Sequence, residues 1–280
     1  MHFQRFAAID WSGARGNRHK GIAIAVADAG DAPPRLVRPG HVWSRSETLD
    51  WLRAEAAGPP LLAGMDFSFA PPFAGRGAYL PGDDVPDTAR AFWAYVDSVC
   101  DDADLGAGSL LEHTHRRHFY FGKADGAKAH FMQLRVCETA FNAAGGGKPS
   151  SVFDAIGAAQ VAKASFAGMR LLHHLGSAMP VWPFDAPGGT SVLVEIYCRA
   201  FIRLGGGRGL KLRSIRDLNA ALAALGSRPT ATRRALNDNE TDVMVAAAGL
   251  RHIAGDPRYW SPSSLTPEIA RTEGWTFGVL

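Results

Sequence analysis

The sequence predicts an α/β protein with a mixed five-stranded sheet flanked by helices and a helical insertion after the fourth strand. Four short runs of apolar and β-branched residues lie within residues 1–69, with a single helical segment among them. Residues 70–189 are rich in proline and glycine and show helical spacing, and strand character then returns. We therefore expect one domain over residues 1–280, with a core at 1–69 and 190–280 and an insertion at about 70–189.

The first predicted strand, residues 6–12, carries a run of apolar residues up to a single carboxylate at Asp10. Both faces of this strand are mostly apolar, so it should lie at the centre of the sheet. A carboxylate at the end of such a strand is costly to bury without a partner, a proton or a cation. The alternative role for Asp10 is to cap the turn at Gly13.

Two further strands, at residues 21–28 and 35–44, follow across short turns. Three consecutive strands joined in this way predict an antiparallel meander. A helix then begins at a capping box formed by Ser44 and Glu47, and it ends near Gly58.

The fourth strand, residues 61–69, carries Asp66 after its apolar run, as the first strand carries Asp10. A helix between the third and fourth strands allows a right-handed crossover that places the fourth strand beside the first. Asp10 and Asp66 should then be neighbours at the same edge of the sheet, although Asp66 could equally cap a turn.

The insertion at about 70–189 reads as a helical cap on the sheet rather than as an independent domain. Helical spacing of apolar residues predicts one helix at 86–100 and a second helix or helix pair at 151–175, with breaks at Gly157 and Gly168.

The C-terminal part of the chain supplies two more acidic residues. A strand at 191–204 has Glu195 in the middle of its apolar run, and a helix capped by Ser214 follows it. A last long helix, from about 233 to 254, carries Asp242 on a face of small residues, which would hold this carboxylate against the sheet.

Four acids on four separate core elements therefore form the candidate site, namely Asp10, Asp66, Glu195 and Asp242. Carboxylates that are forced together repel one another unless a cation compensates. Mg²⁺ suits such a site because it prefers oxygen ligands, and two such ions can assist phosphodiester hydrolysis. A zinc site is disfavoured because no histidine or cysteine pair competes as a ligand. For Glu195, a buried ion pair with an arginine is the competing interpretation.

The chain resembles a family of predicted nucleases with a ribonuclease H fold, the domain-of-unknown-function family number 429. The motifs that carry the resemblance are AAIDWSG (7–13), GMDFSFAPP (64–72), PSSVFDAIGAAQVAKASFAGM (149–169), VWPFD (181–185), VEIYCRAF (194–201), TDVMVAAAGLRH (241–252) and EGWTFGV (273–279). The resemblance implies a ribonuclease H-like sheet with Asp10, Asp66, Glu195 and Asp242 around Mg²⁺ or Mn²⁺.

Two positions depart from the patterns that the resemblance implies. Cys198 stands where this family usually has proline, which should change only the end of the strand. Asn239 stands where helices of the nuclease type often carry a second acid, and an amide is a weaker Mg²⁺ ligand. The sequence therefore leaves open whether one or two metals bind.

The insertion contains two other segments that could carry chemistry. His113, His115 and His118 are closely spaced, but basic neighbours favour a solvated or phosphate-contacting loop over a zinc site. Basic and aromatic residues then alternate and could track a nucleic-acid backbone and stack bases, or form an aromatic core segment with exposed basic flanks. These residues are Arg116, Arg117, Phe119, Tyr120, Phe121, Lys123 and Lys128.

A glycine-rich run at 205–209 precedes Lys211. Such a loop can cradle phosphate, but it lacks the order of residues in a P-loop, so a hairpin turn is the better interpretation.

Composition sets limits on the location and on the partners. The net charge of +3 is weak evidence for a polyanionic partner. The three cysteines are far apart and show neither metal spacing nor a disulfide pattern. The N-terminus lacks the apolar core of a signal peptide, and no apolar run approaches the ~18–20 residues of a membrane span, so we expect a cytoplasmic protein.

The leading functional expectation is a Mg²⁺- or Mn²⁺-dependent nuclease, a hydrolase that uses a metal-activated water to cleave phosphodiester bonds in nucleic acid. One alternative is a nucleotide-binding ATPase or kinase-like protein of the same fold, which would need paired glycine-rich phosphate loops that are not seen here. The other is a non-catalytic nucleic-acid-binding module that keeps the sheet.

Overall fold

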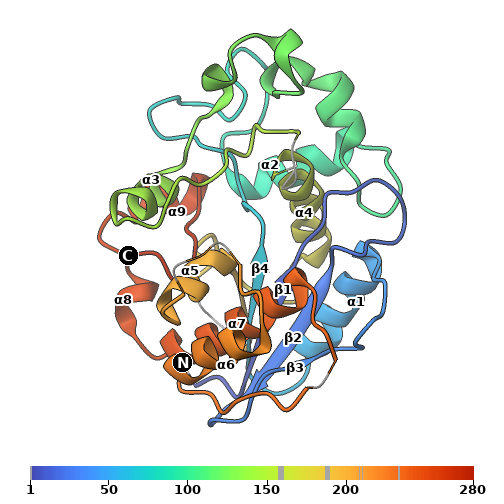
Figure 1. Cartoon of the computed structure of the whole chain (residues 1–280). Coiled ribbons are helices and arrows are strands. Elements are labelled where there is room, and N and C mark those ends of the chain that lie inside the picture. Colours follow the sequence, from blue (N-terminus) through green and yellow to red (C-terminus); the bar gives the residue numbers. More distant parts are fainter. Residues whose placement is uncertain (1, 157–160, 187–189, 208, 210, 233) are drawn as a thin grey trace.

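A mixed six-stranded sheet forms the centre of the protein in a computed structural model that describes residues 2–156, 161–186, 190–207, 209, 211–232 and 234–280 (Figure 1). Its strands lie in the order β3-β2-β1-β4-β6-β5, and only β2 runs against the others. The strands are β1 (Arg5–Asp10), β2 (Ala23–Asp28), β3 (Arg35–Leu36), β4 (Leu61–Asp66), β5 (Val181–Trp182) and β6 (Val192–Glu195). The α/β class is confirmed, and the predicted count of five strands omitted the short edge strand β5.

The predicted crossover between the third and fourth strands is confirmed. Helix α1 (Arg45–Ala56) begins at the capping box of Ser44 and Glu47 and leads into β4. Strand β4 lies parallel to β1, with Asp66 directly opposite Asp10. The first three strands form the expected antiparallel meander, although β3 contains only two residues.

The predicted strand at 191–204 is wrong in its second half. Strand β6 ends at Glu195, and helix α5 (Cys198–Leu204) follows. Its buried residues Cys198, Phe201 and Ile202 recur at helical spacing, a pattern that a short apolar run shares with a strand. Glu195 therefore lies at the end of a strand and not in its middle.

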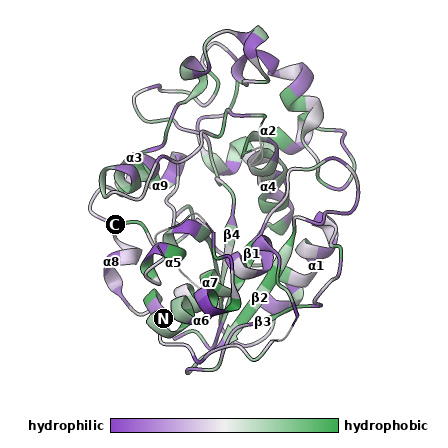
Figure 2. Cartoon of the chain, viewed as in Figure 1, coloured by the Kyte–Doolittle hydropathy of each residue, from purple (hydrophilic) through white to green (hydrophobic). Residues whose placement is uncertain are grey.

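Helices cover both faces of the sheet and create two hydrophobic cores. One core joins alternate residues of β1, such as Ala7 and Ile9, to α1, α2 (Ala89–Val99) and α4 (Val161–Leu175). The other core joins Phe6 and Ala8 to α5, α6 (Ile215–Ala224) and α7 (Asp238–Ile253). The strands at the centre are accordingly hydrophobic, while hydrophilic residues lie toward the periphery (Figure 2).

Helix α7 packs on β1 and β2, as its small residues predict. Gly249 faces Phe201 of α5, because a Cβ at this position would lie 2.2 Å from the Phe201 ring. Gly64 of β4 makes the same kind of close approach to Ile196 and Leu250. The predicted start near 233 is too early, because residues 234–237 are not helical and the helix begins at Asp238, with Asn237 as its cap.

The insertion contains α2, α3 (Val136–Ala143) and α4, and much of it lies beyond one end of the sheet (Figure 1). Its helix α4 packs on one face of the sheet, and β5, near its end, pairs with β6. Short helical turns at Leu110–Thr114, Arg116–His118, Lys123–Asp125 and Lys128–Phe131 connect them. Residues 151–156 do not join α4, and the predicted break at Gly157 lies outside the described residues. The predicted break at Gly168 is wrong, because α4 continues through this residue. A side chain here would collide with the Phe67 ring, so the glycine provides space for that ring.

Two short helices near the C-terminus, α8 (Pro257–Trp260) and α9 (Pro267–Thr272), complete the fold. Helix α6 begins at Ser214, as predicted. Among the helices of the described residues, none has both the length and the apolar character that crossing a bilayer requires.

The close approach at Gly64 gives a test of the packing between β4 and α7. A Gly64→Ala Cβ would lie 2.5 Å from Ile196 Cγ2, so we expect a loss of about 1–3 kcal/mol in the free energy of unfolding. Urea denaturation measures this value. Gly255→Ala is the control, because a Cβ there would meet no atom within 4 Å; equal stability of the two variants would refute the packing argument.

Candidate metal centre

A cavity of about 610 Å³ opens where the ends of β1, β4 and β6 meet the insertion. Its lining includes all four acids that the sequence singled out, Asp10, Asp66, Glu195 and Asp242. Residues of the insertion, among them Pro149, Ser150, Ala164 and Ser165, line the opposite wall. The insertion therefore forms one side of the cavity in which the acids lie.

Asp10 and Asp66 reach the cavity from neighbouring parallel strands. They are paired in register at the last position of β1 and β4, so their side chains leave the same face of the sheet about 5 Å apart. The Asp66 carboxylate accepts a hydrogen bond of 3.3 Å from the backbone N–H of Cys198. The structure thus brings these two acids together, as the two strand ends predicted.

Asp242 reaches the same cavity from α7, which covers the face of the sheet to which Ala8 and Leu62 belong. The residue is 9% exposed, and its Oδ2 lies 3.6 Å from Nζ of Lys211. Its Oδ1 is buried without a hydrogen-bond partner among the residues that the structure describes. A buried oxygen that lacks a donor is an acceptor for a cation or a water.

The pKa of each of the three aspartates is raised. Burial is the main cause for each of them. The pKa of Asp10 is well above its ordinary value, with the charges of Asp66 and Asp242 as the next contributions. Burial raises the pKa of Asp66 to about 6, with the charges of Asp242 and Glu195 adding to it. Burial likewise raises the pKa of Asp242 to about 6, with the charge of Asp238 adding to it.

Lys211 offsets part of this repulsion. Its ammonium lowers the pKa of Asp10 and Asp242, and it lies 3.2 Å from Asp238. In the sequence, Lys211 stands out only because it follows a glycine-rich run, of which Arg208 lies outside the described residues. Its position beside the acids follows from the fold, since 211 and 242 are far apart in the chain.

Glu195 leaves the opposite face of the sheet from Asp10 and Asp66. It is aligned with Met65 of β4, and Met65 belongs to the core that contains α4 and not to the core that contains α7. Successive residues of a strand point to opposite faces, so a shift of one position separates Glu195 from the aspartates. Its negative charge still contributes to the raised pKa of Asp66.

The carboxylate of Glu195 binds Arg135 of the insertion. Nη1 of Arg135 donates to Oε2 at 2.7 Å, and Nη2 donates to Oε1 at 2.5 Å. The backbone N–H of Phe69 and the hydroxyl of Thr276 donate to the same carboxylate at 2.7 and 2.6 Å. This is the buried ion pair that competed with metal binding, and the metal role of Glu195 stays a prediction.

The basic and aromatic segment of the insertion has an aromatic core with paired basic residues. Phe119 and Tyr120 are buried. Arg116 stacks on Phe121, with its guanidinium carbon 4.2 Å from the ring centre, and donates to Asp125 at 2.7 Å. The other pairs are Arg117 with Asp83 and Lys128 with Asp154. These partners favour the core interpretation over base stacking by Phe119 and Tyr120.

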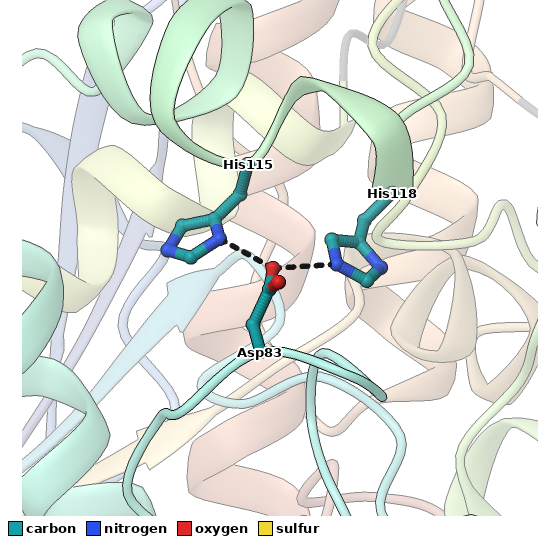
Figure 3. Close-up of side chains that lie close together, drawn as sticks. All are labelled: Asp83, His115 and His118. Carbon is teal, nitrogen blue, oxygen red and sulfur yellow. Dashed lines mark hydrogen bonds and ion pairs between the residues drawn. The ribbon is translucent and has the colours of Figure 1, made fainter.

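The tightest group of metal-type side chains lies elsewhere in the insertion. Within the described part of the chain, Asp83, His115 and His118 alone form a set of three whose ligand atoms lie within 4.8 Å of one another (Figure 3). The aspartates of the cavity share a space and influence one another's pKa without such close convergence. The sequence analysis considered the histidines but not Asp83, which lies far earlier in the chain.

Comparisons with known proteins found no match for this chain among protein-family models, curated proteins or solved structures.

The raised pKa of Asp66 predicts how stability depends on pH without metal. The pKa rises from 3.8 to about 6 on folding, so the unfolded chain ionises first and the folded protein loses stability as pH rises through this window. Asp66→Asn removes this loss and should stabilise the metal-free protein by about 1–3 kcal/mol at pH 7.5, but not at pH 4. Urea denaturation in a chelator at both pH values measures the difference.

Asp101→Asn, which changes an exposed acid outside the cavity, is the control for this experiment and should have no such effect. Equal destabilisation by Asp66→Asn at both pH values would contradict the raised pKa of Asp66.

The Arg135–Glu195 pair predicts a large cost when one partner is removed. Arg135→Met leaves the buried carboxylates of Glu195 and Glu138 without their cation, so the free energy of unfolding should fall by about 3–5 kcal/mol. The control is Arg116→Met, whose partly exposed pair with Asp125 should contribute less than about 1 kcal/mol. Similar losses in both variants would contradict the structural role of Arg135.

Proposed function

We propose that this chain is a Mg²⁺- or Mn²⁺-dependent phosphodiesterase that acts on nucleic acid. The observation that carries the proposal is the gathering of Asp10, Asp66 and Asp242 at one cavity, where the buried Asp242 Oδ1 has no donor among the residues that the structure describes. Three buried acids with raised pKa values destabilise the metal-free protein at neutral pH, and selection for stability alone would not favour them.

The donors fit a hard divalent cation. All three aspartates offer carboxylate oxygens, the ligands that Mg²⁺ prefers, and the cavity has room for the waters that Mg²⁺ retains. When bound, such a cation would activate water and stabilise the charge on a leaving oxygen. Glu195 would enter the site only by giving up Arg135, so we assign the ligands to the three aspartates and give Glu195 the task of holding the insertion in place.

Two basic residues in the cavity suit a phosphate-containing substrate. Lys211 and Arg199 both line it, and Nε of Arg199 is buried without a hydrogen-bond partner among the described residues. A cation bound by Asp242 would compete with Lys211 for that carboxylate, so the ammonium would become available to phosphate oxygens. Phosphate binding in this proposal therefore rests on the cavity and not on the paired basic residues of the insertion.

The order of the elements supports a ribonuclease H-like assignment. An antiparallel meander, a crossover helix, a parallel fourth strand and a late helix supply Asp10, Asp66 and Asp242 in the order that the family resemblance implies. The insertion enters after β4, also as that resemblance implies.

Cleavage assays on branched, single-stranded and RNA–DNA hybrid substrates test the proposal. The wild type should cleave at least one of them with Mg²⁺ or Mn²⁺ and none in a chelator. Asp10→Asn and Asp242→Asn should each reduce the rate at least about 100-fold, because loss of even an outer-shell partner of a metal ligand costs 10–100-fold. Calorimetric titration with Mn²⁺ should show the same loss of binding.

The control for these assays is Asp50→Asn, an exposed acid on α1 whose side chain is 77% exposed. It should cleave and bind Mn²⁺ as the wild type does. Absence of cleavage on every substrate, or full activity of Asp10→Asn, would end the nuclease proposal.

A further inference from the structure

Asp83, His115 and His118 converge in the insertion, outside the cavity of the aspartates (Figure 3). Oδ2 of Asp83 lies 2.7 Å from Nδ1 of His115 and 2.8 Å from Nε2 of His118. His115 directly precedes the helical turn Arg116–His118 and His118 ends it, and in such a turn residues three apart lie on the same side. Asp83 comes from the loop before α2, so the cluster joins two separate segments of the insertion.

The protons available to His118 do not satisfy all of its neighbours. The guanidinium of Arg117 can only donate, and its Nε lies 3.3 Å from Nε2 of His118. The same nitrogen lies 2.8 Å from a carboxylate oxygen of Asp83, which can only accept. A ring nitrogen carries either one proton or one lone pair, so Nε2 cannot serve both neighbours, and the shorter contact, to Asp83, sets the direction in which it points.

The second nitrogen of His115 is held in the way that metal-ligating histidines are held. Its Nε2 lies 2.7 Å from the hydroxyl of Tyr95 on α2, while Nδ1 faces Asp83. An outer hydrogen bond of this kind fixes the ring and its tautomer. Arg117 likewise contacts the other oxygen of Asp83. The cluster therefore offers three metal-ligating side chains, and two of them, His115 and Asp83, are held by further contacts with Tyr95 and Arg117.

We propose that Asp83, His115 and His118 bind one zinc ion that links the loop before α2 to the segment after it. Two imidazole nitrogens and one carboxylate oxygen are a donor set for Zn²⁺, with a fourth position left for water. His115 is buried, and the side chains of His118 and Asp83 are 11% and 20% exposed, so an ion can enter from one side.

This site differs in chemistry from the cavity of the aspartates. Imidazole ligands favour zinc and related transition metals, whereas sites made only of carboxylates favour Mg²⁺ and Mn²⁺. Tetrahedral ligation at zinc separates donor atoms by about 3.3 Å, so the side chains would move apart by about half an ångström when the ion enters. The inference is independent of the nuclease proposal, because neither site shares a ligand with the other.

Titration of the metal-stripped full-length protein with Zn²⁺, in excess Mg²⁺, tests the inference. The wild type should bind one equivalent of Zn²⁺, and Co²⁺ in its place should give the visible absorption of a tetrahedral site. His118→Ala and Asp83→Asn should each weaken Zn²⁺ binding by at least about 100-fold, and Tyr95→Phe by about tenfold.

His113→Ala is the matched control, because His113 lies in the same segment, is exposed and is outside the cluster. It should bind Zn²⁺ as the wild type does, and so should Asp242→Asn. Circular dichroism checks that each variant folds. Should the ligand variants fail to fold, X-ray absorption of the zinc-loaded wild type should show two imidazole ligands at about 2.0–2.1 Å.

Failure of the wild type to bind Zn²⁺ in excess Mg²⁺ would overturn the inference. Unchanged binding in a folded His118→Ala protein, or an absorption spectrum without imidazole ligands, would overturn it as well.

Discussion

The burial of neighbouring carboxylates at the edge of the sheet is the constraint on which the rest of the site depends. Asp10 and Asp66 end two adjacent parallel strands, and Asp242 lies against them from α7. Lys211 offsets part of this charge, and within the described part of the chain one Asp242 oxygen still has no donor. Close packing of α7 fixes the arrangement. Gly64 and Gly249 have no side chain that would hold the helix away from its neighbours.

The two faces of the sheet divide the acidic residues between two tasks. The aspartates lie on the face of α7, where a cation would relieve their repulsion. Glu195, one position out of phase, faces the insertion, where Arg135, Phe69 and Thr276 satisfy its oxygens. The ion pair between Arg135 and Glu195 also holds α3 at the rim of the cavity. The carboxylate of Glu195 thus positions the wall of the cavity, and the carboxylates of the aspartates lie inside it. Both arrangements compensate buried negative charge: Arg135 compensates Glu195, and a bound cation would compensate the aspartates.

Much of this site could be predicted from local sequence patterns, and what could not be predicted depends on long-range geometry. Two apolar runs that each end in an aspartate, with a capped helix between the strands, were enough to place Asp10 beside Asp66. The direction of Glu195 was not accessible, because the end of β6 and the start of α5 share one apolar run and strand parity depends on where the strand ends. Strand β5 has only two residues, too few for a periodic signal. The partnership of Asp83 with His115 and His118 has no local signature at all, since the loop and the helical turn meet only in the folded insertion. The ribonuclease H-like assignment and the nuclease activity stay predictions.

The central claim is that the three aspartates together bind a divalent cation, and anomalous diffraction from a crystal of the protein soaked in Mn²⁺ tests it most directly. The account predicts an anomalous peak within ligand distance of Asp10, Asp66 and Asp242, with Lys211 displaced from Asp242. A crystal that shows no peak at the cavity, with the Lys211–Asp242 contact intact at saturating Mn²⁺, would contradict it.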